Sequence, residues 1–468
     1  MDETEPLLRL PDEILVEIFQ HLDPYDPGIF AISTLNKRLH YIALPIYLSG
    51  YGIPDASAPV CQEIVLMPSR LHLLGTLQTA LFIRSVKHIS CSFFLNTLPH
   101  HIRRLTTFLS VLESVDEVTL VFLVGLNLDT TVPILELVTS AITKLVDVIM
   151  ERQVRVLTIQ DNLFLGRSSF QEREMRSRTT VKRLMSDVGR RIGRAFVRRA
   201  EAPAPAGSRK FQPSLQKFEL HSALLLLPPC HSWTMAALRT FGNLTSLSIA
   251  RIETPERSCA EILSSIHLPS LEYFSMNLRC KIPAAALDHF FLRHPLISIL
   301  SLGADLYPLA GNHVSSKGCL PKLANLSASP SYVRFIMADK RAPVVCNVRL
   351  LINVSGGLFF RDINPPRVWY YEDSLIRDTG TRMPSPDSLR NASALELVST
   401  GFSVEFVAFA IHCLPSFPAL QSLSLAGCSF YDFDARPFFN HVKQACPEIQ
   451  SVTLDGQTYD VKPDDPYA

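Results

Sequence analysis

The chain has 468 residues, of which 47% are hydrophobic, so it can bury one large core or several smaller ones. Its 45 Lys and Arg nearly balance its 44 Asp and Glu, and the net charge of +1 excludes a global attraction to nucleic acid or to an anionic membrane. Because no apolar run is long enough to span a bilayer and the first residues are acidic, we expect an intracellular protein, cytoplasmic or nuclear, with no membrane partner.

Residues 8–48 have the pattern of a compact module of three helices. Pro11 suits a first helical position, and Asp12 and Glu13 place negative charge at the positive end of the helix dipole. The apolar residues of this first helix fall on one broad face and are Ile14, Leu15, Ile18, Phe19 and Leu22. That face is too wide for two short helices to cover, so it packs on the rest of the chain or docks on another protein.

After the first helix we expect a turn at Pro27 and Gly28, then helices over residues 29–35 and 37–47, the last kinked or ended by Pro45. This module resembles an F-box. The matching positions are Leu10, Pro11, Glu13, Ile14, Leu15, Ile18, Phe19 and Leu22, followed by an Asn-Lys-Arg element at residues 36–38. The resemblance implies a trihelical domain in which those eight residues bind the Skp-type adaptor of cullin–RING ubiquitin ligases.

A short strand pattern, apolar-x-x-apolar-x-apolar, recurs about ten times after the module, often with a proline two residues upstream. Most steps between copies fall within the period of leucine-rich repeats, and helix-like runs such as 258–266 and 284–292 lie between the strands. The array resembles the leucine-rich repeats of F-box proteins. The implied fold class is α/β, with an N-terminal trihelical F-box followed by a leucine-rich-repeat-like solenoid of horseshoe form.

Two segments interrupt this rhythm. Arg167 to Arg199 is basic and is interpreted as a solvated insertion, with a nuclear-localisation patch, an anion-binding arm or a partner helix as alternatives. The long step from residue 345 to residue 392 indicates a degenerate repeat or an insertion around Arg361 to Pro386. We therefore expect an F-box-like domain at 1–50, degenerate repeats at 51–165, the basic insertion and linker at 166–210, the main array at 211–460 and a tail at 461–468.

Alternation along each strand places the residues between the apolar ones on an exposed face. This face is small, neutral and rich in hydroxyl groups, and it lacks the Arg cluster of a phosphate site and the basic and aromatic residues of a nucleic-acid surface. The residues expected to bind a target there are Lys217, Glu219, Tyr273, Ile299, Asn325, Asn347 and Arg349. The alternative is that this face contacts little and that the loops bind.

The sequence contains no nucleotide-binding, zinc-protease or nucleophile motif, so we expect no catalytic, cofactor or metal site and no enzyme activity. The ten cysteines have no metal-binding spacing and are interpreted as reduced, mostly buried thiols. Only Cys428 falls where a leucine-rich repeat would carry its Asn or Cys.

Two functions fit these patterns. The first is the substrate-recognition subunit of an SCF-type (Skp–cullin–F-box) ubiquitin ligase, with the F-box on the Skp adaptor and the array holding an unidentified target protein. The alternative is a non-catalytic scaffold whose F-box-like helices cap its own solenoid, which burial of Leu10, Pro11 and Phe19 against residues 50–130 would favour. A third hypothesis makes the basic segment a nucleic-acid arm.

Overall fold

The computed structural model describes residues 10–54, 56–94, 98–123, 132–161, 214–222, 225, 230–252, 256–278, 282–303, 320–337, 345–352, 389, 391–399, 404–426 and 435–461. The chain forms two compact units, Met1–Ala237 and Leu238–Ala468. The interrupting segments predicted at Arg167–Arg199 and Arg361–Pro386, together with Cys428, lie outside the described residues.

The first unit begins with three helices, which are α1 (Asp12–Gln20), α2 (Pro27–Ser33) and α3 (Lys37–Gly50). Pro11 occupies the N-cap position of α1, with φ −55° and ψ 154°, and is not its first helical residue. The turn predicted at Pro27 and Gly28 is wrong, because the Asp26 carboxylate accepts the Gly28 N–H and caps a helix that opens with Pro27. The helix α3 continues through Pro45, so that proline does not end it.

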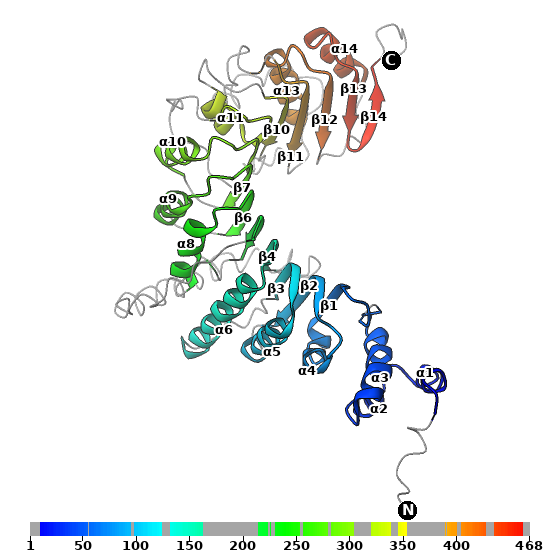
Figure 1. Cartoon of the computed structure of the whole chain (residues 1–468). Helices are drawn as coiled ribbons and strands as arrows, with labels where there is room; N and C mark the ends of the chain where they lie inside the picture. The colour runs from blue at the N-terminus through cyan, green and yellow to red at the C-terminus, as the bar shows by residue number, and fades with distance from the viewer. Residues whose placement is uncertain are drawn as a thin grey trace, which may run out of the picture. The chain divides into compact units, whose positions relative to one another are not determined.

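Strands and helices then alternate through the rest of the first unit (Figure 1). They are β1 (Cys61–Leu66), α4 (Leu73–Thr79), β2 (Ser85–Phe94), α5 (Leu98–Val111), β3 (Ser114–Leu123), α6 (Val132–Glu151), β4 (Val156–Asp161) and β5 (Lys217–His221). The five strands pair in chain order and all pairs are parallel. Because β4 pairs directly with β5, the basic segment lies between two adjacent strands.

The second unit continues the same alternation after α8 (Cys230–Thr240), which contains the boundary between the units. Its strands are β6 (Ser246–Ile252), β7 (Tyr273–Leu278), β8 (Ile299–Leu302), β9 (Asn325–Ala328), β10 (Asn347–Ile352), β11 (Ala394–Ser399), β12 (Ser422–Ala426), β13 (Ser451–Leu454) and β14 (Gln457–Asp460). Its helices are α9 (Glu256–Ser265), α10 (Ala284–Arg293), α11 (Pro330–Met337), α13 (Val404–Cys413) and α14 (Ala435–Ala445).

Strands β6 to β13 are parallel neighbours in chain order, and each copy of the predicted pattern forms one strand. The first apolar residue of each copy is buried ahead of its strand, as Leu271 and Leu420 show, and the next two apolar residues face the same core. The strand β10 pairs directly with β11, so no further strand of the sheet separates the two ends of the long step.

Two strands do not carry the repeated sequence pattern and were not predicted. The strand β1 is the first strand of the first unit and pairs with β2. The strand β14 folds back antiparallel on β13 and is the last strand of the second unit. Asp455 and Gly456 both have positive φ, 46° and 84°, as the tight hairpin between β13 and β14 requires. This Asp-Gly pair was the sequence signal for the hairpin, and it lay just beyond the last repeat.

The cysteines agree only in part with the expected reduced thiols. Cys91 and Cys413 are free and buried, and burial raises the pKa of both thiols. Burial also raises the pKa of Cys446 to about 11, so these thiols resist forming the reactive thiolate. Cys259 corrects the expectation, because it is buried and disulfide-bonded. The spacing of cysteines along the sequence does not predict this bond, because the fold determines which cysteines come close together.

His294 ties neighbouring repeats of the second unit together. Its fully buried ring places Nδ1 2.7 Å from the Phe290 carbonyl oxygen, and Nε2 accepts the Leu268 N–H at 3.2 Å. Because Nε2 accepts, the proton lies on Nδ1, and only the neutral ring satisfies both bonds. Burial, helped by the positive charge of Arg293, lowers the pKa of His294 to about 4, although the bond to Phe290 acts in the opposite direction.

The neutral ring of His294 makes stability depend on pH. Its folded pKa lies below the ordinary 6.5, so the unfolded chain binds the proton more tightly, and the stabilisation present above pH 6.5 is lost as the pH falls toward 4. From pH 7.5 to pH 5, we expect the unfolding free energy of the unaltered protein to fall by about 2 kcal/mol more than that of His294→Gln. Urea titrations of both proteins measure this difference, and equal pH dependence would contradict the assignment.

Candidate functional site

The structure divides the predicted adaptor face of α1 into an inner and an outer part. Leu15 and Phe19 are buried, and α1 packs against α3. Ile14, Ile18 and Leu22 are 41%, 36% and 38% exposed. Pro11 and Glu13 are also exposed, and Leu10 is half-buried.

The outer part forms one stripe along the helix. Ile14 and Ile18 are one turn apart on α1, so they lie one above the other, whereas Leu22 follows two residues after the end of the helix and Pro11 directly precedes its first residue. We call these four residues the α1 stripe. Single exposed apolar residues are ordinary on a protein surface, but a contiguous apolar stripe is typical of a binding surface.

The start of α1 is held on α3 by a side chain from the first turn of α3. The Arg38 guanidinium contacts the Asp12 carboxylate at 2.6 Å and donates to the Leu10 carbonyl oxygen. Asn36 caps α3 by accepting the Leu39 N–H. The Leu-Pro start and the stripe are therefore fixed relative to the rest of the module.

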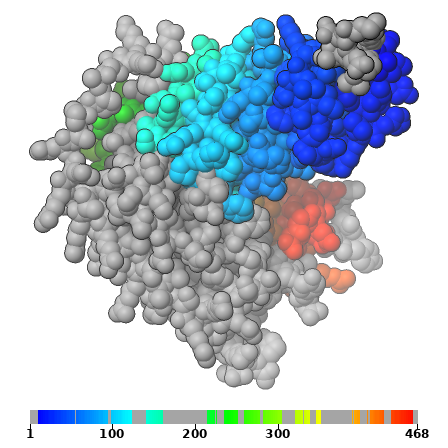
Figure 2. All heavy atoms as spheres, turned by 90° about the horizontal axis from the view of Figure 1, so that it is seen from below, coloured from blue at the N-terminus to red at the C-terminus, as the bar shows by residue number. Residues whose placement is uncertain are grey.

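The helix α3 joins the module to the strands of the first unit. His40 is buried and bridges the module to the segment before β2, because its Nε2 accepts the Leu81 N–H at 3.3 Å and its Nδ1 lies 3.2 Å from the Ser33 carbonyl oxygen. Its ring packs against Phe82 at 5.7 Å. Arg70 adds a hydrogen bond to the Tyr51 carbonyl oxygen at 2.8 Å. In the space-filling view, the dark blue surface of the module continues into the lighter blue surface of the strands and helices that follow (Figure 2).

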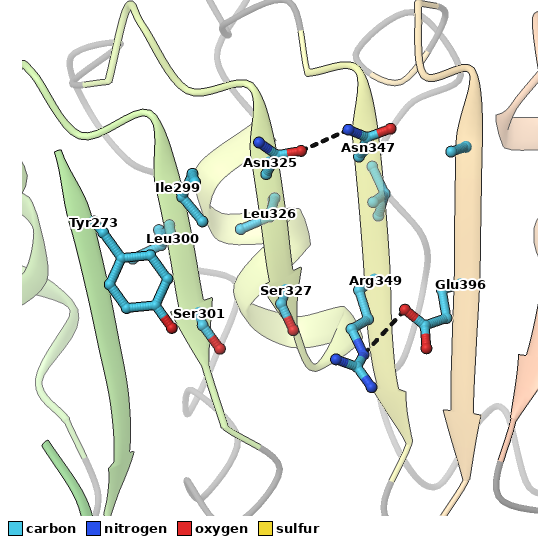
Figure 3. Close-up of a pocket in the computed structure, with 12 residues that line it drawn as sticks. Tyr273, Ile299, Leu300, Ser301, Asn325, Leu326, Ser327, Asn347, Arg349 and Glu396 are labelled. Atoms are coloured by element: carbon cyan, nitrogen blue, oxygen red, sulfur yellow. Dashed lines mark hydrogen bonds and ion pairs between the residues drawn. The ribbon is translucent and has the colours of Figure 1, made fainter. Parts of the chain in front are cut away.

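A second candidate site lies on the exposed face of strands β7 to β11 (Figure 3). Strand register forms two rows across these strands, with the first made of Tyr273, Ile299, Asn325, Asn347 and Ala394 and the second of Ser275, Ser301, Ser327, Arg349 and Glu396. All of these except Ser275 line an open groove of about 410 Å³. Of the residues predicted to bind a target, the structure brings Tyr273, Ile299, Asn325, Asn347 and Arg349 together here.

Two polar pairs organise this groove. The Asn347 Nδ2 donates to the Asn325 Oδ1 at 2.6 Å, between the first positions of β9 and β10. The Arg349 Nε lies 3.2 Å from the Glu396 Oε2, between β10 and β11. Glu396 was missed by the sequence prediction, although the alternation within its own repeat places it on the exposed face.

Lys217 and Glu219 belong to the first unit and are not part of the groove. They form an ion pair at 2.7 Å, and the Thr158 hydroxyl donates to Glu219 at 3.2 Å. Burial alone would raise the pKa of Glu219, but the hydrogen bond and positive charge of Lys217 outweigh it, and the pKa is lowered. This carboxylate is therefore already occupied by partners within the same face.

The first unit holds another polar cluster that the sequence prediction missed. His88 lies between Glu63 and Thr119, with its Nδ1 2.9 Å from the carboxylate and its Nε2 3.2 Å from the hydroxyl. The three residues come from β2, β1 and β3 and face the same side of the sheet. Within the described residues, no group of three or more His, Cys, Asp or Glu is arranged to hold a metal ion. None of the helices in the described part of the chain is long and apolar enough to cross a membrane.

The N-terminal module matches a known protein family. Residues 7–45 match the family model of the F-box domain, whereas the comparison with curated proteins gives no match. A solved structure entitled "Crystal structure of Rad7 and Elc1 complex in yeast" matches with 10% identity and a TM-score of 0.35, over 95% of this chain and 93% of that chain. Those values are too low to assign a shared fold or activity. Residues 7–45 of this chain are an F-box domain.

Proposed function

We propose that the protein is the substrate-recognition subunit of an SCF-type ubiquitin ligase. The observation that carries this proposal is the α1 stripe, in which Ile14, Ile18 and Leu22 are exposed on an F-box domain. An apolar stripe on a helix whose other apolar residues are buried fits docking into the groove of a Skp-type adaptor. The predicted adaptor-binding set also includes Leu10, Pro11, Glu13, Leu15 and Phe19, of which the last two would act by packing α1 on α3.

The rest of the chain is proposed to be a leucine-rich-repeat-like solenoid of horseshoe form that holds the target protein. Parallel strands in chain order within each unit, each followed by a helix in most repeats, support this proposal. The domain limits proposed from the sequence stay as given, with the F-box-like domain at 1–50 and the main array at 211–460. The subunit would act by raising the effective concentration of a target near the ligase core, and the chain itself would carry no catalytic group.

The scaffold alternative has one observation in its favour. The end of the module contacts the chain around the first strands, since His40 bonds to Leu81 and packs on Phe82, and the Tyr51 carbonyl oxygen accepts from Arg70, as a cap on the first repeat would. However, Pro11 is exposed and Leu10 is only half-buried, and the burial of Phe19 accompanies the packing of α1 on α3. The module can therefore cap the array with α3 and still present α1, which favours the ligase role.

The double change Pro11→Ala and Ile14→Asp tests the adaptor site. Ile14→Asp places a charge in the centre of the α1 stripe, so we expect Kd for a purified Skp-type adaptor to rise by about 30- to 1000-fold, which corresponds to about 2–4 kcal/mol. Isothermal titration calorimetry with the full-length protein measures this change.

The matched control is Val111→Asp, at an exposed aliphatic residue that ends α5 in the same unit. It should bind the adaptor as the unaltered chain does, within about twofold. If the unaltered protein is folded and does not bind the adaptor, the ligase role is wrong.

His40→Ala tests whether the packing of α3 on the chain that follows the module is independent of adaptor binding by the α1 stripe. The change removes a buried ring that packs on Phe82 and accepts the Leu81 N–H, so it should lower the free energy of unfolding by about 1–3 kcal/mol. Adaptor affinity should stay within about twofold of the unaltered protein, since His40 is buried and lies outside the α1 stripe. Thermal unfolding and adaptor titration of the same sample measure both effects. Loss of adaptor binding in a folded variant would show that the two faces are not independent.

A further inference from the structure

The groove on β7 to β11 changes in chemistry from one end to the other. Its first strands present Tyr273 and the 38% exposed Ile299, its middle strands present the amides of Asn325 and Asn347, and its last strands present one ion pair (Figure 3). The second row adds the hydroxyls of Ser301 and Ser327, which both donate and accept hydrogen bonds. A ligand that fits the groove must therefore offer an apolar group at one end and neutral polar groups beside it.

Among the described residues that line the groove, Arg349 is the only cationic side chain, and it is already paired. Arg349 is 49% exposed and Glu396 is 37% exposed, and their side chains pair with each other. A phosphate would have to displace Glu396 and would then lie beside a carboxylate of like charge. Phosphate recognition in proteins uses clusters of Arg or Lys, because the ligand carries nearly two negative charges. The groove is therefore unsuited to a phosphorylated or acidic ligand.

The asparagine pair has a free donor and a free acceptor. Since the Asn347 Nδ2 donates to the Asn325 Oδ1, the Asn325 nitrogen and the Asn347 oxygen remain at the two outer ends of the pair, as Figure 3 shows. A peptide group presents one N–H and one C=O of the same kind. The pair therefore matches the backbone of an extended chain that crosses the strands.

The length of the groove sets the size of such a segment. From β7 to β11 there are four spacings between neighbouring strands, and at about 4.8 Å each they span roughly 19 Å. An extended chain rises about 3.3 Å per residue, so about six residues cover this span.

We propose that this groove binds an extended, uncharged segment of about six residues from a target protein. An aliphatic or aromatic side chain of the segment covers Ile299 beside Tyr273, and its backbone hydrogen-bonds with Asn325 and Asn347. Recognition does not require phosphorylation of the target. The inference rests on the proposed function for the statement that the bound segment belongs to a ligase target.

The test selects random heptapeptides from a phage-displayed library on the full-length protein. We expect the selected peptides to share an apolar residue flanked by uncharged residues. With a fluorescent selected peptide, Ile299→Asp should raise Kd at least about tenfold, because it replaces the exposed apolar side chain of the groove with a charge. The control Ser451→Asp, in the same row on β13 but outside the groove, should change Kd by less than about twofold.

A charge exchange separates a neutral groove from an anion site. Arg349→Glu and Glu396→Arg each leave two like charges side by side and should raise Kd about three- to tenfold, and the combined exchange should restore it to within about threefold. Adding a phosphate to a serine of the selected peptide should weaken binding. If Arg349→Glu abolishes binding, the exchange does not restore it and the phosphorylated peptide binds more tightly, the groove is an anion site and the proposal is wrong.

Two further results would overturn the proposal. The first is that no peptide is enriched in the selection. The second is that a selected peptide binds Ile299→Asp with the same Kd as the unaltered protein. Adaptor titration without peptide separates this failure from failure of the ligase role. Adaptor binding without peptide binding would reject only the groove assignment, and peptide binding without adaptor binding would reject only the ligase role.

Discussion

The parallel pairing of strands in chain order is the constraint on which the rest of the structure depends. A parallel neighbour can be reached only by a connection that crosses back over the sheet, so most repeats carry a helix between two strands. The helices and the inward strand rows bury each other, and residues such as Phe274 and Phe290 pack with their rings 4.5 Å apart. The outward rows remain free to carry function. Insertions fit between paired strands without breaking the pairing, as between β10 and β11.

The F-box domain is attached through one of its helices to the strands and helices that follow it. One helix of the module, α3, packs against the segment that precedes β2, where the buried His40 accepts the Leu81 N–H and its ring contacts Phe82. The helix α1 is held in place by the buried Leu15 and Phe19 and by the contact of Arg38 with Asp12. Its remaining apolar residues stay exposed at a fixed position relative to the first unit. Intramolecular packing and the proposed docking on a partner therefore use different helices of one small domain.

The exposed face of the strands is close to neutral because oppositely charged side chains on it lie side by side. Oppositely charged side chains pair on the exposed faces of both units, Arg349 with Glu396 in one and Lys217 with Glu219 in the other. Cross-strand neighbours about 5 Å apart make such pairs favourable and make isolated like charges costly. Binding on such a face depends on shape, hydrogen bonds and apolar contact more than on net charge.

The sequence by itself determined the F-box helices, the strands of the repeats and the inward and outward rows, because hydrophobic periodicity and proline position are local properties. It also predicted five of the groove residues, since alternation alone places Tyr273, Ile299 and Asn325 on one face. Only the tertiary structure decided which outward residues meet. The pairing of β10 with β11 brings Glu396 to Arg349 across an insertion whose length hides the contact. The same reason explains the Cys259 disulfide and the split of α1 into buried and exposed residues, because both depend on which elements pack together.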